Sequence, residues 1–329
     1  MSNVPVLVLY AMVLAIVALA VGYLGRFEVP RPPVGRFVGS DILIMAVVLV
    51  VMPFAYLALP NGVLIAVFGI VVFSATQLTL SPLLGGRYAA LAGLVLCGLP
   101  LAAHAAGWDV TMLVANDLAV AVLTVGFSNM WVQAAMKAGH VAWLAAALTV
   151  YDTLATGVFP VTSDFVNRVV GIPFAPLLAT RYGDAPVFIG LGDCLMLALW
   201  PLVAAKTYGR AARWGAIAVD VLVLAAMFAG GVTGVIDGVF PVLTLLGPLI
   251  VAQYLFWRRR RTAVRPGRAS LTANLRTVQE SLSDRYAPGT WVALHEGEVV
   301  GTGPTAGTAC RAALRAGVTE TPVTILITG

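Results

Sequence analysis

Long apolar runs recur along most of this chain, and they constrain its fold more than any other feature. A membrane-spanning helix needs about 20 consecutive apolar residues, and runs of that length follow one another as far as the arginines at Arg258–Arg261. Hydrophobic residues make up 60% of the 329 residues and charged residues 11%, whereas roughly 25% charged residues is usual in soluble domains. A water-soluble enzyme and a disordered chain are therefore excluded, and an all-α polytopic membrane protein is expected.

The apolar runs predict nine transmembrane helices within residues 1–262. The expected spans are 4–24, 41–59, 62–80, 87–106, 112–133, 139–160, 185–205, 212–231 and 235–257.

The composition changes after the ninth span, and residues 263–329 predict a small soluble α+β domain of the ββαβ type. A helix is expected over 269–286, a hairpin from Trp291 to Val300, a helix over 305–316 and a strand from Val323 to Thr328. No cluster of chemically active side chains stands out there, so we expect a regulatory or docking role, or a role in homo-oligomerisation.

The distribution of Lys and Arg predicts the orientation in the cell membrane. Before the C-terminal domain, the loops after the second, fourth and eighth spans hold no Lys or Arg. The loop after the sixth span holds Arg168 and Arg181. The rest lie in odd-numbered loops or in the run Arg258–Arg261 after the last span. Because positively charged loops stay in the cytoplasm, the N-terminus is expected outside and the C-terminus in the cytoplasm.

The remaining composition points to no cofactor, metal or nucleic acid. Membrane orientation accounts for the net charge of +5, and the three cysteines are far apart and form no CxxC pair. No Lys or Arg precedes the first apolar run, which disfavours a cleaved secretory signal peptide.

Four aspartates fall well inside predicted spans, away from the span ends, where a carboxylate is expensive and usually functional. They are Asp117, Asp152, Asp193 and Asp220. Asp117 follows Asn116 and is expected to make interhelical hydrogen bonds, and Asp220 is also interpreted as structural.

Asp152 and Asp193 are predicted to lie level in the membrane. At about 1.5 Å per residue, Asp152 lies roughly 20 Å from the cytoplasmic face, or ~10 Å from the outer face of a ~30 Å core. If the next span is helical from residue 185, Asp193 lies ~12 Å below that same outer face. Two such neighbours on antiparallel helices are expected to face each other.

A facing pair of carboxylates has the chemistry of an aspartic protease. The two groups share a proton and titrate together, so that one activates a water while the other polarises a peptide carbonyl. Gly190 and Gly192 are expected to permit close backbone approach to Asp193. Breaks at Pro241 and again at Gly247-Pro248 are expected to expose backbone groups for an extended peptide.

These residues resemble the presenilin and signal peptide peptidase family of intramembrane aspartyl proteases, which carries Tyr-Asp, Gly-x-Gly-Asp and Pro-Ala-Leu in three of nine spans. The third motif has Val in place of Ala. The resemblance implies that Asp152 and Asp193 are catalytic and that the other motif residues shape the site. The matching residues are Tyr151 and Asp152; Gly190, Leu191, Gly192 and Asp193; and Pro241, Val242 and Leu243.

The same resemblance implies an endopeptidase whose partners are transmembrane peptide substrates and the lipid bilayer. With the N-terminus outside, type II-oriented segments such as remnant signal peptides are the implied substrates. Two alternatives stay open. One is a proton- or cation-coupled transporter that uses the four aspartates as a relay. The other is a prepilin-peptidase-like enzyme, whose acids would lie near the cytoplasmic face.

Overall fold

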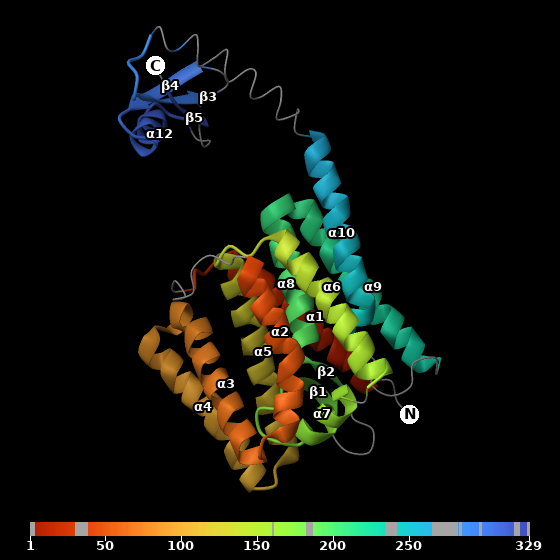
Figure 1. Cartoon of the computed structure of the whole chain (residues 1–329). Helices are drawn as coiled ribbons and strands as arrows, with labels where there is room; N and C mark the ends of the chain where they lie inside the picture. Colours follow the sequence, from red (N-terminus) through yellow and green to blue (C-terminus); the bar gives the residue numbers. More distant parts are fainter. Residues whose placement is uncertain are drawn as a thin grey trace. The chain divides into compact units, whose positions relative to one another are not determined.

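The computed structural model divides into two compact units, Met1–Arg258 and Arg259–Gly329 (Figure 1). The boundary falls close to the predicted one at residue 262, and each unit is described by itself. The structure describes residues 4–29, 39–159, 161–181, 187–233, 242–264, 282, 285–295, 298–318 and 323–327.

The larger unit is a bundle of helices, and the structure is that of a multi-pass membrane protein. Six of the described helices are long and apolar enough to cross a membrane, or seven spans are present if α6 and α7, bent by 84° to each other, form one. The six are α1 (Val4–Leu24), α2 (Gly39–Ala58), α3 (Asn61–Leu84), α4 (Gly86–Ala105), α5 (Asp109–Gln133) and α9 (Arg210–Val232). The others are α6 (Ala138–Gly157), α7 (Val161–Val169), α8 (Leu191–Tyr208) and α10 (Val242–Val264).

The observed helices coincide with most of the predicted spans but correct two of them. The seventh span was expected to be helical from residue 185, and this is wrong: Val187–Gly190 is a strand and α8 begins at Leu191. The predicted break at Gly247-Pro248 is also wrong, because α10 continues through Pro248. Pro241 lies outside the described residues.

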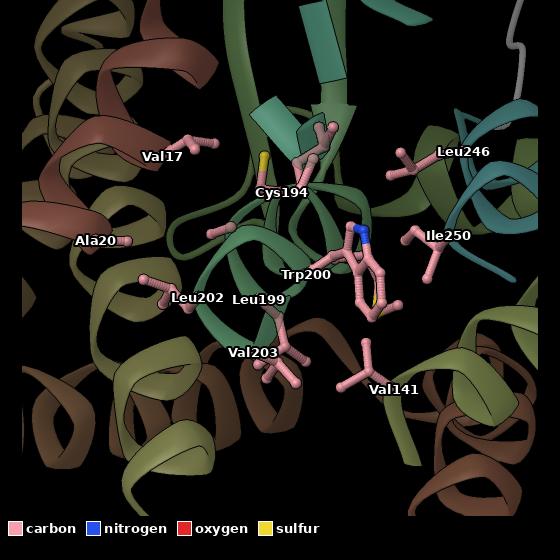
Figure 2. Packing of buried hydrophobic residues seen from close by; sticks show 14 of the residues in the cluster. Val17, Ala20, Val141, Cys194, Leu199, Trp200, Leu202, Val203, Leu246 and Ile250 are labelled. Carbon is pink, nitrogen blue, oxygen red and sulfur yellow. The ribbon is translucent and has the colours of Figure 1, made fainter. Parts of the chain in front are cut away.

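Helix α8 forms the centre of the bundle. It packs against α1, α5, α6 and α9, and most of its residues from Cys194 to Ala204 are buried. A helix that is apolar on all sides is suited to such a position. Figure 2 shows Trp200 of α8 beside Ile250 and Val141, and its indole N–H donates to Gln253 Oε1 at 2.5 Å.

A β-hairpin interrupts the helical bundle next to α7 (Figure 1). Strands β1 (Leu177–Arg181) and β2 (Val187–Gly190) pair antiparallel, with Leu177 opposite Gly190 and a bulge between Ala179 and Arg181. The chain therefore enters α8 from an extended strand, which places Asp193 in the first turn of that helix.

The smaller unit confirms the predicted small α+β fold. Strands β3 (Trp291–His295), β4 (Glu298–Gly303) and β5 (Val323–Leu326) form an antiparallel sheet in the order β4-β3-β5, and α12 (Ala306–Arg315) contacts all three strands. Of the predicted helix over 269–286, residues 269–281, 283 and 284 lie outside the described residues.

Helix packing in the larger unit depends on close approach at glycine, which a substitution can test. A Cβ at Gly126 of α5 would lie 1.9 Å from Thr79 Oγ1 and 3.2 Å from its Cβ. We expect Gly126→Ala to destabilise the protein by about 1–3 kcal/mol through overpacking, measured by thermal unfolding in detergent.

Gly98 in α4 is the matched control, because a Cβ there would meet nothing within 4 Å. Gly98→Ala should leave stability unchanged or raise it by up to about 1 kcal/mol, since Ala favours a helix over Gly. Equal melting temperatures for the two variants would contradict the role of this contact.

Candidate active site

Asp193 is held at the start of α8 by backbone amides. Gly190 is the N-cap of α8, and the Asp193 carboxylate accepts hydrogen bonds from the backbone N–H groups of Gly190 and Leu243. An acidic side chain at the third helical position commonly reaches back to the N-cap amide in this way. The Gly-x-Gly-Asp sequence thus folds as a helix cap whose acid also contacts the first described turn of α10.

Asp152 lies within electrostatic range of Asp193. The two residues come from α6 and α8, which pack against each other, and Asp152 is placed in the last part of α6. Tyr151 is half-buried and interacts electrostatically with Asp152. The two aspartates singled out from the sequence therefore lie on packed helices and within electrostatic range of each other.

Leu243 links the helices that carry the two aspartates. Its N–H donates to the Asp193 carboxylate, and its carbonyl oxygen lies 3.1 Å from Thr149 Oγ1 of α6. Thr149 is on the turn of α6 before Asp152. A Cβ at Gly247 would lie 1.8 Å from Thr149 Oγ1, so glycine at this position allows α10 to approach α6.

The predicted site-shaping residues take different positions. A Cβ at Gly190 would lie 3.3 Å from Asp193 Oδ2, so the group that approaches this glycine is the aspartate itself. A Cβ at Gly192 would meet nothing within 4 Å among the described residues. Leu191 packs against the apolar core and donates its N–H to Pro176 O at 2.9 Å. Val242 and Leu243 are buried.

The two remaining aspartates differ in their surroundings. Asp117 of α5 accepts the Ala179 N–H of β1 at 2.8 Å, so its hydrogen bond goes to a strand and not to another helix as predicted. Asn116 beside it bonds the backbone at Ile172 and Phe174. Asp220 is fully buried, and neither of its carboxylate oxygens has a hydrogen-bond partner in the described part of the chain.

Two features were not predicted from the sequence: the hydrogen bonds of Asn116 to the backbone at Ile172 and Phe174, and the hairpin of β1 and β2. The signal for Asn116 was its place beside an intramembrane Asp, which was interpreted as ordinary helix packing. The signal for the hairpin was Pro173 and Pro176 before a short apolar stretch. Among the described residues, no group of three or more His, Cys, Asp or Glu could hold a metal ion.

The fold and the site together define a polytopic membrane protein with two aspartates, on packed helices, that lie within electrostatic range of each other. No protein-family model and no curated protein matches the chain. What the pair does must therefore be argued from its geometry and chemistry.

Thr149→Val tests the link between α6 and α10. The Thr149 hydroxyl lies 2.7 Å from Ala145 O and 3.1 Å from Leu243 O, and valine keeps the shape while removing the donor. We expect a loss of about 1 kcal/mol of unfolding free energy, measured by thermal unfolding in detergent. Thr149→Ser keeps the hydroxyl and should retain most of the stability; equal losses in both variants would mean that the methyl group, not the donor, matters.

Proposed function

We propose that this protein is an intramembrane aspartyl endopeptidase that hydrolyses transmembrane segments between Asp152 and Asp193. The observation that carries the proposal is that these two carboxylates, on the packed helices α6 and α8, lie within electrostatic range of each other, with Asp193 beside the amides of Gly190 and Leu243. Acid–base hydrolysis needs one group that takes up a proton and one that gives a proton, and a pair of acids on packed helices can supply both.

The reaction follows from the shared proton of such a pair. The ionised carboxylate takes a proton from water, whose oxygen attacks the carbonyl carbon of the substrate peptide. The protonated carboxyl gives its proton to the carbonyl oxygen, and a tetrahedral diol forms. When the diol collapses, one diol hydroxyl gives its proton to the carboxylate that is now ionised. The C–N bond breaks and the other, protonated carboxyl gives its proton to the departing nitrogen, so the pair again holds one proton.

The outer edge of β2 supports binding of an extended peptide. The Leu191 N–H bonds to Pro176 O, and the Ala179 N–H points away from β2 to Asp117. Since hydrogen-bonding direction alternates along an antiparallel pair, Phe188 turns its backbone N–H and C=O to the edge away from β1. No third strand pairs there in the part of the chain that the structure describes.

A substrate strand added to this edge would lie next to Gly190 and hence next to Asp193. Strand addition uses main-chain hydrogen bonds and so accepts many sequences. It would also keep the substrate unwound, as hydrolysis requires, because a helix hides its carbonyl groups. The Tyr-Asp and Gly-x-Gly-Asp motifs that resemble the presenilin and signal peptide peptidase family support the same reaction.

The orientation and the number of spans belong to this proposal. Nine spans, with the N-terminus outside, would place the pair near the outer face and favour type II-oriented substrates such as remnant signal peptides. The nine described helices of at least 18 residues are compatible with that count. Helices α8 and α10 are not among the six clear spans; α8 holds Asp193 and Lys206, and α10 ends in arginines.

Substitution of either acid tests the reaction directly. In proteoliposomes with a single-pass transmembrane peptide, Asp152→Asn and Asp193→Asn should each lower the cleavage rate by about 10²–10⁴-fold, because each removes one half of the acid–base pair. Cleavage products are quantified by mass spectrometry, and folding is checked by thermal unfolding. Wild-type rates in either folded variant would overturn the proposal.

Asp220→Asn is the matched control, since it also neutralises a buried membrane carboxylate. Cleavage should be unchanged in this variant. The transporter alternative makes the opposite prediction: ion flux through wild-type proteoliposomes without cleavage, and loss of that flux in Asp220→Asn.

Reporter fusions test the orientation. A reporter active only in the cytoplasm should work when fused after Gly329 and fail when fused between α4 and α5, near Gly107. The reverse pattern would place the N-terminus in the cytoplasm, invert the charge argument and move the aspartates to the cytoplasmic side.

A further inference from the structure

The segment that leads into the candidate active site departs from helical geometry within the bundle. Phe174 has φ +64°, a conformation that costs energy for a bulky residue, and its side chain is buried. Backbone groups in such a segment lack the partners that a helix supplies, and an unsatisfied group in an apolar environment is costly.

Two neighbouring side chains of α5 supply those partners. Asn116 donates its Nδ2 to Ile172 O at 3.3 Å and accepts the Phe174 N–H on Oδ1 at 2.9 Å. Asp117 accepts the Ala179 N–H on Oδ1 at 2.8 Å. Asn116 is fully buried and Asp117 is 8% exposed, so both bonds are shielded from water.

These bonds connect to Asp193 through the hairpin. Ala179 is paired with Phe188 of β2, and Leu191 donates to Pro176 O at 2.9 Å. Gly190, at the end of β2, donates to the Asp193 carboxylate. A second route is spatial: Asp117 is within electrostatic range of Cys194, the residue after Asp193, and α5 packs directly on α8.

We infer that Asn116 and Asp117 are positioning residues that hold the hairpin, and through it Asp193, in working geometry. The inference rests on the proposed proteolysis. Neither side chain contacts the reacting atoms. What Asp117 contributes is a hydrogen-bond acceptor, and its negative charge is not required for that contact.

Because Asp117 acts as a hydrogen-bond acceptor, two substitutions at this position should have different effects. Asp117→Asn keeps an oxygen for the Ala179 N–H, whereas Asp117→Leu leaves this amide without a partner. We expect kcat for peptide cleavage to fall about 10-fold or more in Asp117→Leu while KM changes much less, because misplacement of a catalytic group chiefly slows the chemical step. Asp117→Asn should keep kcat within about threefold of wild type.

Asn116→Leu, compared with Asn129→Leu, isolates the effect of position. Asn129 is also a fully buried asparagine of α5, but it donates to Ala20 O and Val125 O, not to the hairpin segment. With rates normalised to the folded fraction, Asn116→Leu should lower kcat and Asn129→Leu should not. If Asp117→Leu or Asn116→Leu does not fold, Asn116→Asp is tested instead. It keeps an acceptor for the Phe174 N–H, so the expected fall in kcat is smaller.

Hydrogen exchange of the full chain in detergent provides a readout independent of activity. Peptides covering 172–181 should exchange faster in Asp117→Leu than in wild type, and Asp117→Asn should remain protected. Wild-type kcat in folded Asp117→Leu, or equal inactivity of Asp117→Asn and Asp117→Leu, overturns the inference. If the wild type cleaves no transmembrane peptide but the exchange pattern is as expected, the proposed proteolysis is wrong, whereas the role of Asp117 in holding the hairpin is supported.

Discussion

A strand inside a helical membrane bundle must have every backbone polar group satisfied, and the rest of this structure depends on how that is done. The hairpin of β1 and β2 satisfies part of its backbone by internal pairing. Asn116 and Asp117 satisfy the groups that face α5. In the described part of the chain no strand pairs with the other edge of β2, and β2 leads directly to Gly190 and Asp193. The polar side chains of α5 and the hairpin are therefore joined by hydrogen bonds that are shielded from water.

The sequence predicted best those features that depend only on the length of an apolar run or on the spacing of a motif. Asp152 and Asp193 were expected to face each other, and the structure places them within electrostatic range. The depth argument that led there assumed a helix from residue 185, yet Val187–Gly190 is extended. A strand advances about 3.3 Å per residue, so the depth calculated for Asp193 from a helix starting at residue 185 does not hold. Short apolar runs such as Val-Phe-Ile-Gly suit strand and helix equally, and pairing with β1 decides.

Other features depended on tertiary contacts that no local pattern reveals. The Asp193 carboxylate contacts α10 through the Leu243 amide, across many residues of intervening chain. The role of Gly190 is local, since it caps α8 and accommodates the acid of the same turn. Asp220 was interpreted as structural, yet its buried carboxylate has no hydrogen-bond partner in the described part of the chain, so the sequence did not reveal its surroundings.

The contact between Thr180 Oγ1 and Pro5 O, 2.9 Å long, joins β1 to the first turns of α1. These residues are made far apart in time during synthesis, and Leu243 is made later still. Because domains form in the order in which the ribosome delivers them, the N-terminal helices enter the membrane well before the aspartate pair can be completed. A half-translated chain consequently holds Asp152 without Asp193, and the contact between Asp193 and Leu243 forms only after α10 has been made.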